Sequence, residues 1–238
     1  MVGQGQVYVT AADEQAGRRW LIAAEATTGR ELWRRENAFT SYPKHKVNSF
    51  ATSTPALDAE HVYCLWQAKD RSSLVAYTHA GETAWELDLG AYKGGHGTAV
   101  SPITAGPFVV VCDDQEAESS VIAVDRKSGE IRWRTPRESD RACYSTPCVF
   151  APAGVEPQLI VVHSYLGISG LDLASGRGLW SITPFGTHQQ RACASPIVYG
   201  DLVIGTSGFA TSEKNTVAVK PAAAADGVEE VYRVTRTA

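Results

Sequence analysis

A short motif recurs four times along the chain, and its spacing constrains the fold more than any other feature. Each copy holds a glycine followed four residues later by a tryptophan. The successive tryptophans lie 52, 48 and 47 residues apart. A period of this length is typical of repeat proteins in which each copy builds one supersecondary unit. The four pairs are Gly29 and Trp33, Gly81 and Trp85, Gly129 and Trp133, and Gly176 and Trp180.

A second landmark keeps the same period. A Ser-Pro or Thr-Pro dipeptide stands at Thr54-Pro55, Ser101-Pro102, Thr146-Pro147 and Ser195-Pro196. Short β-branched runs follow each dipeptide, and Gly, Asp and Ser turn residues separate these runs. Each repeat therefore predicts four short strands.

The repeated residues have mechanical roles. Asp125 and Asp172 stand four residues before their glycines, where a carboxylate can accept hydrogen bonds from the N–H groups of a turn; Glu25 takes this place in the first copy. The glycine supplies a positive φ at the hairpin. The tryptophan then lies on the next strand, where a large ring can fill the wedge between neighbouring sheets. A degenerate fifth copy has Gly227 and, five residues later, Tyr232.

Period, strand number and one bulky anchor per unit together predict an all-β fold. We expect a β-propeller of four-stranded antiparallel blades around a central channel, with about five blades present in a single domain, 1–238. The first blade is expected to lack its innermost strand. The predicted blades are approximately 1–40, 49–93, 98–138, 143–186 and 192–238.

The motif resembles the repeat of the pyrroloquinoline-quinone-type (PQQ-like) β-propellers of the quinoprotein-dehydrogenase-like superfamily. The similarity extends from Val7 to Thr235. It is nearest to bacterial PQQ-binding-like propellers, which are related to the outer-membrane assembly lipoprotein of the β-barrel assembly machinery. The resemblance implies a seven- or eight-bladed ring, of which this chain is a part, and a periplasmic or other extracytoplasmic location. Residues 1–6 carry no signal-peptide pattern.

Composition narrows the class of partner. The chain of 238 residues is 44% hydrophobic and 20% charged, with a net charge of −4. This is a globular composition without the basic stripe of a nucleic-acid-binding domain. No apolar run approaches the roughly 18 residues of a transmembrane segment. We expect protein or peptide partners, and self-association through open sheet edges.

Three functions remain open, and the sequence favours the first. The first function is that of a non-catalytic scaffold for protein interaction or assembly, or of a ligand-binding module. The second is a PQQ-dependent dehydrogenase, for which the resemblance implies two adjacent cysteines and a calcium-binding set of Glu, Asn and Asp. The third is a small-molecule sensor domain. None of the five cysteines is adjacent to another, so no catalytic, cofactor or metal residue is predicted, and PQQ and calcium are disfavoured. The cysteines are Cys64, Cys112, Cys143, Cys148 and Cys193.

Polar residues precede each Ser/Thr-Pro dipeptide, in segments that lead into the innermost strand. In a propeller such segments rim one mouth of the channel. Our hypothesis is a mildly cationic rim that binds an acidic peptide or small anion. The alternative is that these residues only satisfy neighbouring carbonyl groups. The candidate rim residues are Lys46, Asn48, His96, Arg141, Gln190 and Arg191.

Two further features have competing interpretations. The acidic run 113–118 lies between predicted strands, and we interpret it as a solvated hairpin loop rather than a cation site. Trp20 and Trp66 lie outside the repeat, where packing is favoured over stacking on a ligand.

Overall fold

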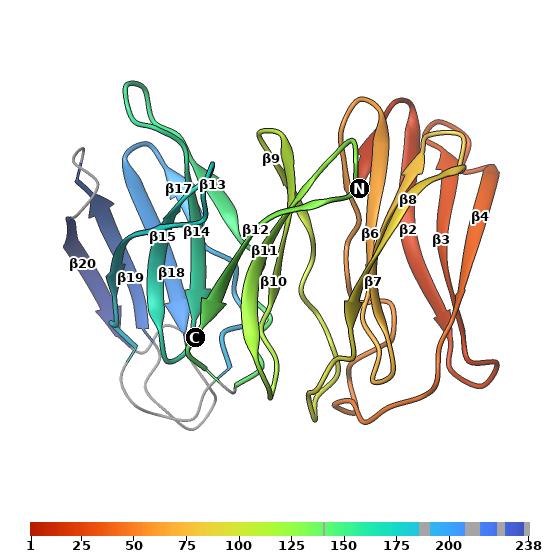
Figure 1. The fold of residues 1–238 in the computed structure, drawn as a ribbon, viewed down its shortest axis with the longest axis horizontal. Helices are drawn as coiled ribbons and strands as arrows, with labels where there is room; N and C mark the ends of the chain where they lie inside the picture. The colour runs from red at the N-terminus through yellow and green to blue at the C-terminus, as the bar shows by residue number, and fades with distance from the viewer. Residues whose placement is uncertain (140, 186–190, 208–214, 223–226, 236–238) are drawn as a thin grey trace. The chain divides into compact units, whose positions relative to one another are not determined.

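The computed structural model describes the chain except residues 140, 186–190, 208–214, 223–226 and 236–238. In the described residues, twenty strands form five four-stranded antiparallel sheets, and there is no helix (Figure 1). Consequently, none of these residues belongs to a helix long and apolar enough to cross a membrane. The predicted all-β fold of four-stranded blades is confirmed.

Each sheet contains four strands that follow one another along the chain. The first is β1 (Val2–Gly3), β2 (Gln6–Asp13), β3 (Arg18–Glu25) and β4 (Glu31–Ala38). The second is β5 (Ala56–Leu57), β6 (His61–Trp66), β7 (Ser72–Thr78) and β8 (Thr83–Gly90). The third is β9 (Ile103–Ala105), β10 (Phe108–Asp113), β11 (Ser119–Asp125) and β12 (Ile131–Arg137). The fourth is β13 (Cys148–Phe150), β14 (Gln158–His163), β15 (Gly167–Asp172) and β16 (Gly178–Ile182). The fifth is β17 (Ile197–Tyr199), β18 (Leu202–Ser207), β19 (Asn215–Pro221) and β20 (Val228–Thr235).

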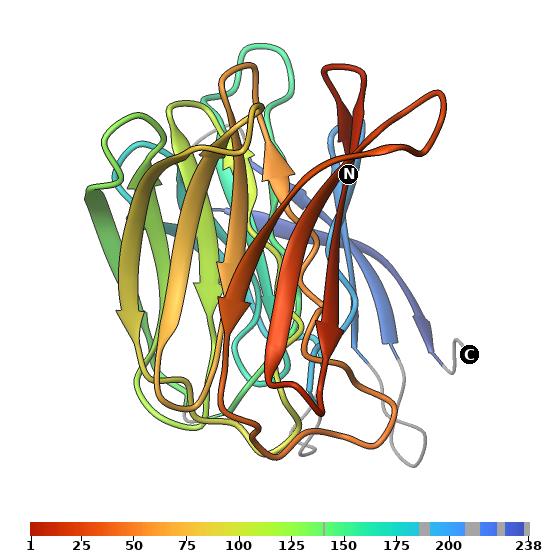
Figure 2. The ribbon, with the colours of Figure 1, turned by 90° about the vertical axis from the view of Figure 1, so that its right-hand side faces the viewer.

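The first sheet corrects one expectation, because its innermost strand is present. β1 pairs with β2 through a two-residue turn in which Gln4 and Gly5 have φ values of 53° and 72° (the red strands in Figure 2). Two successive positive φ values define the turn type that favours tight hairpins. The strand escaped the sequence analysis because two residues are too few to show an alternating pattern.

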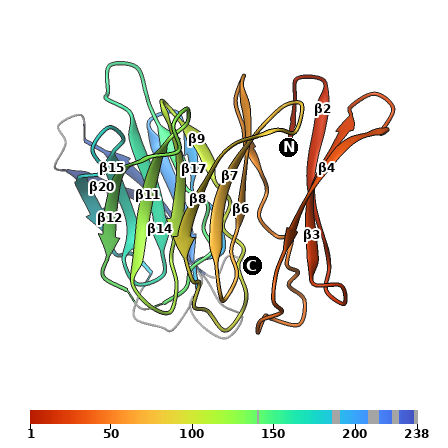
Figure 3. The ribbon, with the colours of Figure 1, turned by 45° about the vertical axis from the view of Figure 1, so that its right-hand side comes forward.

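The chain divides into two compact units, each with its own core. The first unit comprises residues 1–109 and 124–131, and the second comprises 110–123 and 132–238, so the third sheet contributes to both. In the first unit the core packs the first sheet against the second (Figure 3). Tyr8 and Leu21 of the first sheet belong to one hydrophobic cluster with Val62 and Val75 of the second. In the second unit the core includes Ile160, Val162, Ile168, Val203 and Val217 of the fourth and fifth sheets.

The tryptophan of one repeat packs on the glycine of the next. A Cβ on Gly81 would lie 2.7 Å from the ring of Trp33, so only glycine permits this approach. The Trp33 indole also donates a hydrogen bond of 2.9 Å to the carbonyl oxygen of His79. The wedge-filling role predicted for the tryptophans is therefore a specific contact between consecutive sheets. The same contacts join Trp85 to Gly129 and Arg126, and Trp133 to Gly176 and Leu173.

The hairpin turns form as the motif predicts. The four repeat glycines have φ values between 72° and 87°. Asp125 Oδ1 accepts hydrogen bonds from the backbone N–H groups of Lys127 and Ser128, at 2.9 and 3.0 Å. Asp172 accepts from Ser175 in the same way, at 2.8 Å. Satisfying these turn donors locally fixes where the tryptophan strand begins.

The Ser/Thr-Pro dipeptides connect consecutive repeats. Within the first unit, Thr54 N donates to Ser101 Oγ at 2.9 Å, and within the second, Thr146 N donates to Ser195 Oγ at 3.2 Å. The hydroxyl of one repeat thus accepts from the backbone of the preceding repeat. This explains why a serine precedes Pro102 and Pro196.

Candidate functional site

The acidic run after β10 is buried at its start, which corrects the interpretation of a solvated loop. The side chain of Asp114 is 1% exposed and that of Arg137 is 7% exposed. Arg137 Nε lies 2.8 Å from Asp114 Oδ1. Burial raises the pKa of Asp114 to about 6; the positive charge of Arg137 opposes this rise, and nearby Asp113 adds to it. The loop turns inward because the guanidinium supplies a partner for a carboxylate that would otherwise be costly to bury.

His163 is completely buried, near Arg137 at the end of β14. Its Nε2 donates to the carbonyl oxygen of Arg141 at 3.2 Å, and its Nδ1 accepts from the N–H groups of Tyr165 and Leu166 at 3.1 and 3.3 Å. These partners define the neutral tautomer with the proton on Nε2. Burial and the charge of Arg137 lower the pKa of His163 to about 4. The imidazole therefore holds two loops together rather than exchanging protons.

Two of the candidate rim arginines belong to this same part of the second unit. Arg191 Nη1 donates to the carbonyl oxygen of Ala142 at 3.0 Å, and Nη2 forms an ion pair with Glu116. Arg141 provides the carbonyl oxygen that His163 contacts. The predicted rim and the acidic run are thus neighbours in space, a relationship that the sequence analysis did not anticipate. Gln190 lies outside the described residues.

The other candidate rim residues belong to the first unit. Asn48 Nδ2 donates to the carbonyl oxygens of His96 and Thr98 at 2.9 and 3.3 Å. The ring of His96 stacks on His45, with centroids 6.1 Å apart. The side chain of Lys46 is exposed. Asn48 and His96 are therefore brought together, and the amide of Asn48 satisfies carbonyl groups of the neighbouring loop.

A cleft of about 320 Å³ lies beside Arg137 in the second unit. Apolar side chains, hydroxyl groups and Tyr165 line it. The cleft exists because the side chains at two repeat positions are small. Thr135, two residues after its tryptophan, has a shorter side chain than Arg35 and Leu87 at the same position of earlier repeats. Ser169 likewise occupies a position that is Ile122 in the preceding repeat. The lining residues include Val121, Val161, Leu171, Ser169, Ser181 and Thr183.

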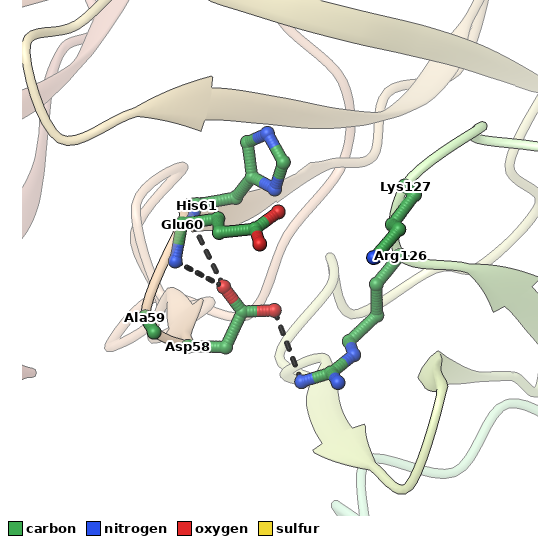
Figure 4. A pocket seen from close by; sticks show the side chains of 6 residues that line it. All are labelled: Asp58, Ala59, Glu60, His61, Arg126 and Lys127. Carbon is green, nitrogen blue, oxygen red and sulfur yellow. Dashed lines mark hydrogen bonds and ion pairs between the residues drawn. The ribbon is translucent and has the colours of Figure 1, made fainter.

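A smaller pocket of about 100 Å³ lies in the first unit around Asp58 (Figure 4). Asp58 accepts hydrogen bonds from the N–H groups of Glu60 and His61 at 2.8 and 2.9 Å, and Arg126 Nη1 lies 3.0 Å from its Oδ2. Burial alone would raise the pKa of Asp58, but these hydrogen bonds and that of the Tyr63 hydroxyl hold it below the usual value. The carboxylate stabilises a turn, and its bonding capacity is used within the protein.

The sequence analysis did not predict that Asp114, Arg137 and His163 lie close together. A signal was present, because Asp113-Asp114 and His163-Ser164 both end the apolar second strand of successive repeats. Equivalent positions in adjacent repeats are neighbours in a repeat protein. Polar residues recurring there indicate a shared polar cluster.

The sheets, the tryptophan–glycine contacts and the Ser/Thr-Pro links define a β-propeller domain built from PQQ-like repeats. A family model described as outer membrane protein assembly factor BamB matches residues 1–186, and the chain belongs to this family.

One curated relative is the serine/threonine-protein kinase AfsK of Streptomyces griseus, 29% identical over 188 residues. These residues are 76% of this chain and 21% of the kinase, so the chain spans about a fifth of that relative. A europium-containing methanol dehydrogenase superposes with a TM-score of 0.68 at 10% identity, over 97% of this chain and 50% of the enzyme. The quinohemoprotein alcohol dehydrogenase of Comamonas testosteroni gives 0.54 at 14% identity, over 87% of this chain and 38% of the enzyme. At such identities these structures establish the fold alone.

Proposed function

We propose that the chain is a non-catalytic propeller module that binds an acidic peptide segment of a partner protein through Arg141 and Arg191. The observation that carries the proposal is the ion pair of Arg191 with Glu116, whose side chain is 35% exposed. The ion pair with an exposed carboxylate supports carboxylate groups as ligands of Arg191. A carboxylate of a partner would replace Glu116 at the same donor.

The buried groups of this region support a binding role over a catalytic one. Both ring nitrogens of His163 are occupied by backbone groups, and Asp114 is paired with Arg137. A general acid or base must reach the substrate proton, and neither of these side chains is exposed to do so.

The residues present do not fit the quinone and calcium ion that the fold family implies. All five cysteines are free, and no two are adjacent in the sequence. In the described part of the chain no three His, Cys, Asp or Glu side chains are grouped as ligands of a cation. The described residues therefore do not provide the donor set expected for these groups.

The binding proposal is tested by fluorescence anisotropy with a labelled oligoglutamate peptide. Replacing Arg191 by Ala should weaken binding at least tenfold. Replacing Glu116 by Gln should strengthen binding, because it removes the carboxylate that competes with the peptide. Lys127→Ala, an exposed cation of the first unit, is the control for net charge. Equal binding by all three variants would refute the proposal, and stronger binding of a DNA oligonucleotide of equal charge would indicate a general polyanion effect.

A ligand-sensing domain is the second candidate. The cleft beside Arg137 and the match to a fifth of a protein kinase favour it. Ser169→Ile, which restores the aliphatic residue of the preceding repeat, should fill the cleft. A neutral sugar or polyol that raises the melting temperature of the native chain should then lose its effect on this variant; a retained effect would place its binding elsewhere.

A further inference from the structure

In the part of the chain that the structure describes, the fifth sheet has an apolar face with exposed side chains. Val203, Val217 and Val219 point from it into the core shared with the fourth sheet. Because side chains alternate along a strand, their neighbours lie on the opposite face. There, cross-strand pairing aligns Ile197 with Ile204, Ile204 with Ala218, and Ala218 with Tyr232. The exposed fractions on this face are 61% for Ile197, 76% for Tyr199, 44% for Tyr232 and 46% for Val234.

Tyr232 is the structural equivalent of the anchor tryptophans. It pairs with Ala218 across the strands, as Trp33 pairs with Ala23 and Trp85 with Ala76. The register shifts immediately beyond each of these alanines. Tyr232 differs from the anchor tryptophans in its contacts. Trp33 and Trp85 each lie on the glycine of the following sheet, whereas nearly half of the Tyr232 side chain is exposed.

The first sheet presents the complementary half of this contact. Gly29 has the φ of 72° shared by the repeat glycines, but among the described residues nothing lies within 4 Å of the position of a Cβ. Gly81, Gly129 and Gly176 are each covered by a tryptophan. The face of the first sheet opposite its core includes Val9, 45% exposed, paired with half-buried Ile22. Trp20 lies two residues from Ile22 and shares this face.

We propose that two copies of this chain associate head to tail, with Tyr232 of one copy over Gly29 of the other. The junction continues the interface that joins consecutive sheets within each unit, since it uses the same pair of positions. The exposed anchor Tyr232 and the uncovered Gly29 are complementary, so the fifth sheet of one copy fits the first sheet of another. Two fifth sheets, or two first sheets, would not fit one another in this way. The contact is heterologous, so further copies can add.

The association is measured by sedimentation velocity over a range of concentrations of the full chain. Tyr232→Asp places a charge in the apolar face, and Gly29→Asn fills the site above the hairpin. Asn tolerates a positive φ, so the hairpin should be retained. Each variant should raise the apparent dissociation constant at least tenfold. Val47→Asp is the control for a new surface charge, because Val47 is 82% exposed and lies in the loop between β4 and β5, outside both faces. It should associate like the unmodified chain.

Mixing the two interface variants gives the decisive result. The Tyr232→Asp chain retains an intact first sheet and the Gly29→Asn chain retains an intact fifth sheet, so together they should form a dimer that grows no further. Circular dichroism confirms folding. If Tyr232→Asp fails to fold, Val234→Asp replaces it on the fifth sheet, and if Gly29→Asn fails to fold, Val9→Asp replaces it on the first sheet. A chain that stays monomeric at all concentrations, or variants that do not combine on mixing, would overturn the proposal; in that case Tyr232 meets Gly29 within one copy or faces a different partner.

Discussion

The indole ring of Trp85 lies so close to Gly129 that a Cβ on the glycine would be 2.8 Å from it. Gly129 also has a φ of 75°, a conformation that other L-residues adopt only with strain. One position therefore meets two independent requirements for glycine. The contact joins the second sheet to the hairpin that opens β12.

Gly129→Ala should destabilise the protein by about 2 kcal/mol or more, because the positive φ alone costs roughly 1–2 kcal/mol and the methyl group must also displace the indole. Urea denaturation monitored by tryptophan fluorescence measures the change. Gly178→Ala is the control, because nothing lies within 4 Å of its Cβ position and its φ is not positive. Equal losses for the two variants would contradict the assigned contact.

Trp85→Phe should lower the free energy of unfolding by about 1 kcal/mol, the usual net value of a hydrogen bond, because the carbonyl oxygen of Arg126 loses the indole donor. Trp85→Ala should cost about 3–5 kcal/mol, since the ring is removed as well. Trp20→Phe removes an indole donor whose bond to Glu36 is exposed, and its stability should change little. Denaturant midpoints at a fixed m-value compare the three variants.

Asp114 should make a pH-dependent contribution to stability. Its pKa of about 6 in the folded state lies above the ordinary value of 3.8, so the folded protein binds more protons between these pH values. The contribution of Asp114 is fully present below about pH 4 and is lost as the pH rises through 6. The stability of Asp114→Asn relative to the unmodified chain should therefore increase from pH 4 to pH 6, by up to about 3 kcal/mol. Unfolding free energies across this range that differ by a constant amount would exclude the assignment.

His163 should contribute with the opposite sign. Its pKa of about 4 lies below the ordinary 6.5, so the unfolded chain binds more protons between these values and stability rises with pH. The stability of His163→Gln relative to the unmodified chain should decrease between pH 4 and pH 6.5, again by up to about 3 kcal/mol. In the unmodified chain the two slopes largely cancel. A double variant should return to nearly the pH dependence of the unmodified chain.

Cys193 should be the most reactive thiol of the folded protein. It is exposed, whereas Cys64 and Cys112 are buried. Burial raises the pKa of all three thiols, so the accessibility of the sulfur makes the difference. Labelling with a maleimide at neutral pH should modify Cys193 at least tenfold faster than either, because the accessible thiolate is the reacting species. Mass spectrometry of peptides identifies the site, and Cys193→Ser should abolish the fast phase. Fast labelling of Cys64 would show that the second sheet opens readily.

The repeat residues predicted most of the fold because their roles are local. A glycine with a positive φ, an aspartate that accepts turn hydrogen bonds and a tryptophan four residues after the glycine act within one hairpin and its neighbour. Because the motif recurs, the same local structure forms in each repeat along the chain. The exception is Trp180, whose indole donates to Gln158 of its own sheet at 2.7 Å, because the fifth repeat departs from the motif.

The sequence by itself determined the strand number of every repeat but the first, the positions of the hairpins and the residues that join consecutive sheets, since all of these depend on short-range chemistry. Only the tertiary structure decided that Asp114 is buried, that Arg137 pairs with it and that His163 is neutral. A run of acidic residues looks solvated from its composition. Whether it is buried depends on a guanidinium 23 residues away, and the packing of the strands brings the two groups together.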